Sequence, residues 1–269
     1  MVAYMEHKDL AATAISDERA REITDNVHRA LDQLAQAVAD AGRPEGCVQL
    51  LAATKTRDVG EVHAAIQAGI RLIGENRPQE ILAKIDGLRE LCAADGLQVG
   101  RQDDDAAPDV PLHLIGQLQS NKIGKILPFT NVIESVDSLD LAQKIARRAV
   151  AHTMTVDVLL EVNESGETSK SGCAPEQARD IAGAIGALDG VRLVGLMTVG
   201  AHVDDEAIVR QGFAHLRELR DELVASGEQG TDECLQLSMG MSGDAAWAID
   251  EGSTQVRLGR AIFGERLFV

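Results

Sequence analysis

Lys55 is the side chain of this sequence with the most evident chemical use. It stands at the end of the apolar run LLAA, between Thr54 and Thr56. The amine of a lysine held near apolar neighbours can condense with an aldehyde to form a Schiff base. An ordinary surface lysine placed just after a strand would have the same sequence context. Lys55 by itself therefore leaves both interpretations open.

Arg257 lies inside a second apolar stretch, TQVRLG. An arginine within a buried strand is costly unless another group pairs with it. One candidate partner is a carboxylate on another strand, such as Glu134 or Glu161, which would make Arg257 part of a structural ion pair. The other is a ligand, for which the guanidinium would be a fixed donor.

Small and hydroxyl-bearing residues surround Arg257 in sequence. The segment LSMGMSGD contains Ser238, Gly240 and Ser242 before a predicted helix, and Gly259 follows the arginine strand. Backbone N–H groups at such turns and helix starts bind phosphate well. These four residues are therefore our candidates for a phosphate site.

Three further residues carry weaker signals. Asn76, in IGENRPQE, could donate to a ligand oxygen or could cap the helix that follows. His113 lies within a strand, where a hydrogen-bonded core histidine is as good an interpretation as a ligand contact. Met197 could lie against a planar ring or serve core packing. The loops at 116–122 and 163–172 are polar, and the second lacks the spacing of a P-loop.

The elements that would position these residues follow a regular alternation. Apolar runs of strand length cover 48–53, 71–74, 112–115, 131–134, 156–162, 193–199, 235–239 and 255–258. Helical spacing of apolar residues is clear over 59–68, 79–93, 139–152, 175–188 and 205–226, with short pieces near 123–127 and 245–251. Another helix, over 17–41, precedes them all. This pattern predicts a single TIM-type (β/α)8 barrel with an extra N-terminal helix.

Barrel closure places the last strand beside the first, so Arg257 and Lys55 would lie on adjacent strands. The loops after strands seven and eight are the usual phosphate site of such barrels. An amine for an aldehyde, an arginine for a ring nitrogen and a phosphate site together describe a site for pyridoxal 5′-phosphate, PLP. We expect one domain over 17–269, a flexible tail over 1–16 and a flexible insertion at about 95–111.

Composition narrows the class of partner. The formal net charge of −17 disfavours nucleic acid, which is bound through Lys and Arg. The N-terminus lacks the pattern of a secretory signal, and apolar runs are too short for a membrane span. The four cysteines are widely spaced, without metal-ligand spacing. We therefore expect a cytoplasmic protein with reduced thiols that binds neither nucleic acid, nor membrane, nor metal.

Seven motifs in order carry a resemblance to a known family. They are ATKT, GENRPQE, HLIGQLQSNK, NESGETSKSG, GLMTVG, LSMGMSGD and GSTQVRLGRAIFGER. Together they resemble the pyridoxal phosphate homeostasis protein family, whose barrel is similar to the N-terminal domain of alanine racemase. The resemblance runs from about Asp17 to the C-terminus.

The resemblance implies roles for individual residues. It implies that Lys55 forms the Schiff base, that Asn76 lies near the phenolic oxygen of PLP, and that Arg257 faces the pyridine nitrogen. Ser238, Ser242 and the backbone around Gly259 would hold the phosphate. An arginine leaves that nitrogen largely unprotonated, so the ring is a weak electron sink.

The sequence departs from the family pattern in two loops. Leu112 and Gln117 replace an aromatic residue and a histidine common around HLIG, and 77–78 is Arg-Pro where tyrosine-valine is common. These differences put the loop contacts in doubt and leave the lysine and the arginine untouched.

The expected function is PLP binding, buffering and delivery, with apo PLP-dependent enzymes as candidate recipients and a monomer favoured. No second domain with a tyrosine base, as in alanine racemase, is expected after Val269, so no catalytic residue is assigned. A weakly active PLP-dependent racemase is the alternative. A third interpretation is a barrel that binds a phosphorylated metabolite, with Lys55 only neutralising charge.

Overall fold

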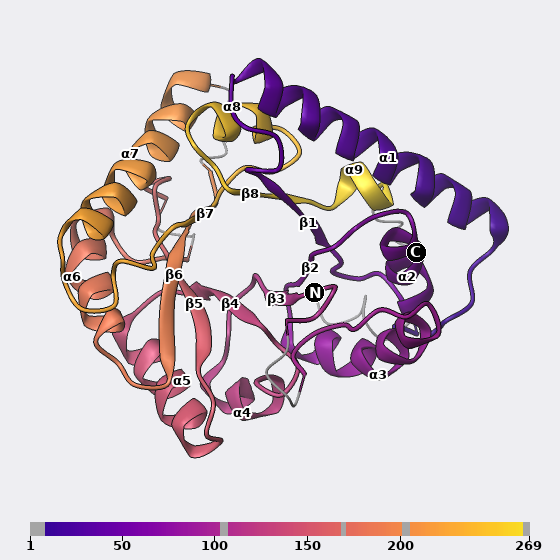
Figure 1. The fold of residues 1–269 in the computed structure, drawn as a ribbon, viewed down its shortest axis with the longest axis horizontal. Helices are drawn as coiled ribbons and strands as arrows, with labels where there is room; N and C mark the ends of the chain where they lie inside the picture. The colour runs from indigo at the N-terminus through magenta and orange to yellow at the C-terminus, as the bar shows by residue number, and fades with distance from the viewer. Residues whose placement is uncertain (1–8, 103–106, 168–170, 201–204, 266–269) are drawn as a thin grey trace.

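The structure is a computed structural model that describes residues 9–102, 107–167, 171–200 and 205–265. Parallel strands form one closed barrel in sequence order, and β8 pairs with β1 (Figure 1). The strands are β1 (Gln49–Ala53), β2 (Ile73–Glu75), β3 (Leu112–Leu114), β4 (Val132–Val136), β5 (Val156–Glu161), β6 (Val191–Met197), β7 (Gln236–Ser238) and β8 (Gln255–Leu258). The predicted (β/α)8 barrel is confirmed.

Helices surround the barrel on the outside (Figure 1). They are α1 (Asp17–Asp40), α2 (Val59–Gln67), α3 (Pro78–Ala94), α4 (Ile123–Ile126), α5 (Leu139–Ala151), α6 (Pro175–Gly186), α7 (Glu206–Ala225), α8 (Ala245–Asp250) and α9 (Arg260–Phe263), with a short 3-10 helix η1 (Ser120–Lys122) before α4. Helix α9 and η1, of four and three residues, were not predicted. None of the described helices is long and apolar enough to cross a membrane.

Burial on both faces explains the composition of the strands. All five residues of β4 and all four of β8 are buried, although both strands contain a charged residue. The strands of a barrel contact helices outside and each other's side chains inside, so they form apolar runs rather than alternating patterns. The charged residues Glu134 and Arg257 therefore lie in the barrel interior and need partners there.

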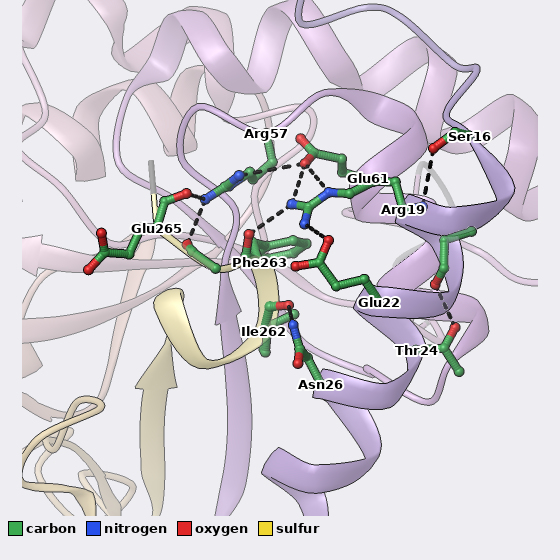
Figure 2. A network of polar contacts seen from close by, with 12 residues as sticks. Ser16, Arg19, Glu22, Thr24, Asn26, Arg57, Glu61, Ile262, Phe263 and Glu265 are labelled. Carbon is green, nitrogen blue, oxygen red and sulfur yellow. Dashed lines mark hydrogen bonds and ion pairs between the residues drawn. The ribbon is translucent and has the colours of Figure 1, made fainter. Parts of the chain in front are cut away.

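Helix α1 braces the part of the barrel where the chain closes. It begins at an N-cap, Ser16, whose hydroxyl accepts from the N–H of Arg19, and it packs against α2, α8 and α9. Figure 2 shows that Arg19 contacts two of these helices. Its Nη2 lies 2.6 Å from Oε1 of Glu61 on α2 and 2.8 Å from the carbonyl oxygen of Phe263 on α9. Arg57, between β1 and α2, donates to the carbonyl of Gly264. The loops after β1 and β8 are thus tied together.

Some residues of the N-terminal tail and of the insertion at 95–111 make contacts with the rest of the chain. Leu10 is buried, and its carbonyl accepts from the N–H of Val59 at the start of α2. Val99 and Val110 are also buried and form a β-bridge with each other. Flexibility over 1–16 and 95–111 stays a prediction, and residues 1–8 and 103–106 lie outside the described chain.

Candidate functional site

A cavity of about 440 Å³ opens at the carboxyl ends of β1, β2 and β3. Side chains from the loops after these strands line it: Lys55, Thr56, Asn76, Arg77, Pro78, Gln79, Glu80, Gly116, Gln117 and Gln119. The carboxyl ends of the strands are the face on which barrel enzymes place their sites. The fold therefore brings two predicted site residues, Lys55 and Asn76, into one cavity.

Asn76 lines the cavity and does not occupy the N-cap position of α3. The N-cap position of α3 is occupied by Arg77, which makes no side-chain cap bond. The amide oxygen of Asn76 is buried, and no described residue donates a hydrogen bond to it. Gly116 packs directly on this residue, since a Cβ there would lie 2.3 Å from the carbonyl oxygen of Asn76. A buried amide oxygen without a donor is costly, and a hydrogen bond from a ligand would relieve that cost.

A cluster of buried charges lies behind the wall of this cavity. Lys84 of α3 donates to Oε1 of Glu75 at 2.6 Å and approaches Oε2 of Glu80 at 3.4 Å. Burial, and to a lesser degree the charge of Glu80, raises the pKa of Glu75 above its ordinary value, while the Lys84 ammonium opposes the shift. No sequence motif predicted this cluster, although the spacing of Glu80 and Lys84, four residues apart in a helix, was a signal for it.

Arg257 faces the barrel interior next to β1, level with Leu51. Its Nη1 donates to the carbonyl and to the hydroxyl oxygen of Ser238, both at 2.7 Å, and its Nη2 donates to the carbonyl of Thr198 at 2.7 Å. A guanidinium has five N–H donors. Nε–H and one Nη2 hydrogen therefore have no acceptor among the described residues.

Glu134 offsets the charge of Arg257, although no salt bridge joins the two side chains among the described residues. Ser238 donates to Oε2 of Glu134 at 2.6 Å, and the side-chain amide of Gln255 donates to Oε1 at 2.7 Å. Burial would raise the pKa of Glu134, yet the hydrogen bond and charge of His113, the charge of Arg257 and the Ser238 hydroxyl hold it below its ordinary value. Burial alone lowers the pKa of Arg257, against the charges of nearby carboxylates.

His113 and Ser238, which were predicted to contact the cofactor, form hydrogen bonds with other residues of the protein. His113 Nδ1 lies 2.6 Å from Oε1 of Glu134, and His113 lines a second cavity of about 370 Å³ at the amino ends of the strands. Ser238 is fully buried, with its hydroxyl shared among Glu134, Arg257 and Gln255. These contacts favour a buried histidine and an arginine-supporting serine over direct ligand contacts. The difference arises because strand residues point inward at different depths of the barrel.

The remaining predicted residues divide between core and surface. Met197 is buried in a small cluster with Val132, Leu159 and Val194. Gly240 has a φ of +96°, and a Cβ there would lie 2.6 Å from that of Ala248 on α8, so only glycine fits this turn.

Ser242 and Gly259 are the two remaining candidates for the phosphate. Ser242 is exposed after β7. Gly259 packs on the end of β1, since a Cβ there would lie 3.3 Å from the carbonyl oxygen of Ala53. The first N–H groups of α9 follow Gly259 and have no acceptor within that helix.

Glu161 adds a titratable group at the carboxyl end of β5. Burial and then the charge of Asp137 raise its pKa to about 7, against the opposing charge of Arg257. Glu161 was predicted only as a possible ion-pair partner of Arg257, and no salt bridge joins the two among the described residues. Asp137 was not anticipated.

Known proteins resemble this chain in sequence over most of its length. The family model described as alanine racemase, N-terminal domain, matches residues 24–267. The pyridoxal phosphate homeostasis protein of Pseudomonas aeruginosa is 39% identical over 246 residues, covering 91% of this chain and 96% of that protein. Its counterpart in Aquifex aeolicus is 36% identical over 244 residues, covering 91% and 98%.

Solved structures agree on the architecture. A protein of unknown function from Bifidobacterium adolescentis shares 63% identity at a TM-score of 0.92, covering 95% of this chain and all of that one. PipY of Synechococcus elongatus, solved with PLP bound, shares 30% identity at a TM-score of 0.68, covering 86% and 100%. The Clostridium difficile alanine racemase, at 16% identity, shares the fold over 57% of its length. The chain belongs to the pyridoxal phosphate homeostasis protein family.

Proposed function

We propose that this protein binds PLP covalently through Lys55 and serves intracellular PLP homeostasis. The observation that carries the proposal is the cavity at the carboxyl ends of the strands, which gathers the Lys55 amine and the Asn76 amide. The PLP-bound structure of PipY supports the choice of cofactor. PLP supplies an aldehyde, to which the Lys55 amine adds with loss of water to leave a C=N bond.

The unused hydrogen-bonding groups of the site fit this cofactor. The free N–H donors of Arg257 suit an unprotonated pyridine nitrogen, which is an acceptor. The amide of Asn76 suits the phenolic oxygen, because its nitrogen can donate when the side chain turns about χ2. Ser242 and the N–H groups that follow Gly259 suit the phosphate. Ser238 would act through Arg257, without touching the phosphate.

Borohydride reduction tests the anchor. Reduction makes a Schiff base permanent, so we expect wild-type protein incubated with PLP to gain one reduced pyridoxyl phosphate adduct on the peptide that carries Lys55. Lys55→Ala should lose both the adduct and the visible absorbance band, whereas Lys144→Ala, a substitution on the outer helix α5, should keep both. An adduct that persists in Lys55→Ala would contradict the proposal.

The physiological role follows from reversible binding. A reactive aldehyde held as an imine is kept from other amines until it is released, which suits buffering in the cytoplasm and delivery to apo PLP-dependent enzymes. We propose that the protein acts as a monomer. To test delivery, protein loaded with PLP should restore activity to an apoenzyme. To test the oligomeric state, light scattering should give the mass of one chain. A loaded protein that never yields its cofactor would exclude delivery.

A further inference from the structure

Lys84 is fully enclosed, with 1% of its surface exposed, in the middle of α3. Lysine is among the residues least often found in such a place, because its ammonium must be paired to remain charged there. The proposed binding of PLP makes no direct use of it, since it does not line the cavity that holds Lys55. Its location therefore needs another explanation.

The ammonium of Lys84 holds the main chain on the amino side of Lys55. Its Nζ donates to the carbonyl oxygen of Thr54 at 2.9 Å and to Oε1 of Glu75 at 2.6 Å. The Thr54 hydroxyl donates to the same carboxylate oxygen at 2.6 Å. Residue 54 is thus fixed through both its carbonyl and its side chain.

Glu80 holds the main chain on the other side. Its Oε2 accepts from the N–H of Thr56 at 2.6 Å and lies 3.4 Å from Nζ of Lys84. Thr56 has a φ of +66°, a left-handed conformation that is unfavourable for a β-branched residue. The bond to Glu80 compensates for this strain at the residue that follows Lys55.

We propose that Lys84, with Glu75 and Glu80, is a positioning residue for Lys55: the hydrogen bonds of these three side chains clamp residues 54 and 56 and so aim the intervening lysine into the cavity. The inference rests on the proposed function for the identity of the aldehyde. The clamp itself is a property of the cofactor-free chain.

Stability alone explains this cluster poorly. Buried ion pairs are often no more stabilising than apolar side chains of similar volume, because desolvation offsets their attraction. The hydrogen bonds that the cluster makes to the main chain go to the residues on either side of Lys55. A constraint on local conformation is what such an arrangement provides, and a well-oriented nucleophile reacts faster than a mobile one.

The experiment compares Glu80→Ala, Glu80→Gln and Lys84→Met with the wild type, and uses Lys144→Met, which breaks a surface pair with Asp140, as matched control. Two quantities are measured. The first is hydrogen exchange of the Thr56 amide in cofactor-free protein by NMR. The second is the rate at which PLP forms the borohydride-reducible adduct on Lys55.

We expect Glu80→Ala and Lys84→Met to expose the Thr56 amide to exchange and to slow adduct formation about 10- to 100-fold. Glu80→Gln keeps an oxygen acceptor and should restore most of both quantities. The Lys144→Met control should match the wild type. If Lys84→Met fails to fold by circular dichroism, the pair of Glu80 variants decides.

A folded Glu80→Ala variant with wild-type exchange and wild-type adduct rate would overturn the clamp. Failure of the proposed function has a different signature, because the wild type would then form no adduct on Lys55. The exchange of Thr56 in the cofactor-free chain would still report on the clamp in that case.

Discussion

Ser238 is the last residue of β7 and Ser242 follows four residues later, yet their surroundings differ completely. Ser238 is enclosed and joins Glu134, Gln255 and Arg257 through one hydroxyl group. Ser242 is exposed on the turn before α8. At the scale of single residues, one serine therefore belongs to the internal support of Arg257 and the other to the surface that would meet a phosphate.

Replacing Ser238 should cost stability. In Ser238→Ala, Oε2 of Glu134 loses its donor and Arg257 loses an acceptor, and an unsatisfied buried polar group costs about 1–3 kcal/mol. Urea unfolding should show this loss in the free energy of unfolding. Ser242→Ala, the matched control, should stay within about 0.5 kcal/mol of the wild type while it weakens PLP binding. Equal stability of the two variants would contradict this division.

Glu161 predicts a pH dependence. Its folded-state pKa of about 7, raised by burial and by Asp137 from an ordinary value of 4.5, means that the folded protein holds this proton more tightly than the unfolded chain does. The free energy of unfolding must then fall as the pH rises from 4.5 to 7, because the unfolded chain releases the proton first.

Glu161→Gln should remove this contribution. Since one pKa unit corresponds to about 1.4 kcal/mol, the variant should be more stable than the wild type by on the order of 1–3 kcal/mol at pH 8, with little advantage at pH 4. Urea titrations at the two pH values measure it. If the difference in unfolding free energy between variant and wild type were the same at both pH values, Glu161 would have an ordinary pKa.

Helix α1 acts at the scale of elements, because it ties the first and last loops of the barrel together. Arg19 bridges Glu61 and the carbonyl of Phe263, and the side-chain amide of Asn26 donates to the carbonyl of Ile262 at 3.1 Å (Figure 2). The guanidinium of Arg57 also stacks over the Phe263 ring at 5.6 Å. The helices that follow Lys55 and Gly259, α2 and α9, are therefore held by the same helix.

Arg19→Ala should loosen this junction. The variant leaves a largely buried carboxylate, Glu61, without its closest cation, and a hydrogen bond to a charged group contributes roughly 1.5–3 kcal/mol. We expect a loss of that order in unfolding free energy and weaker PLP binding. Arg21→Ala, on the exposed side of α1, is the control and should change neither. Unaltered PLP binding in a destabilised Arg19→Ala would mean that the helix supports the fold alone.

At the scale of the whole molecule, the fold buries three of the four cysteine thiols. Cys92, Cys173 and Cys234 are buried, while Cys47 is partly exposed. Burial, with nearby carboxylates in the first two cases, raises the pKa of Cys92 to about 11 and those of Cys173 and Cys234 to about 12. Since the thiolate is the reactive form, three of the four thiols are protected both by access and by protonation.

Thiol modification should therefore report on global unfolding. Native protein should react with a disulfide reagent quickly at Cys47 alone, and the three buried thiols should react only at the rate at which the barrel opens. A Cys47→Ser variant should remove the fast phase and leave the slow one. Fast reaction of a second thiol in native protein would reveal local opening near that cysteine.

The sequence determined the strands and main helices of this protein and singled out Lys55. Period and composition placed the strands and main helices within a few residues of their observed ends, because those signals act along short stretches of chain. They also placed Lys55 at a strand end, and the ordered motifs gave the family. The exceptions were α9 and η1, each of about one helical turn.

Only the tertiary structure decided which polar residues meet. Glu134 accepts from Ser238 and Gln255, which stand 104 and 121 residues away, and Lys84 reaches back 30 residues to Thr54. Such contacts depend on strand register and on closure of the barrel, which no local pattern encodes. Closure sets the depth at which each inward side chain lies, and for that reason Lys55 faces the cavity at one end while His113 faces the other.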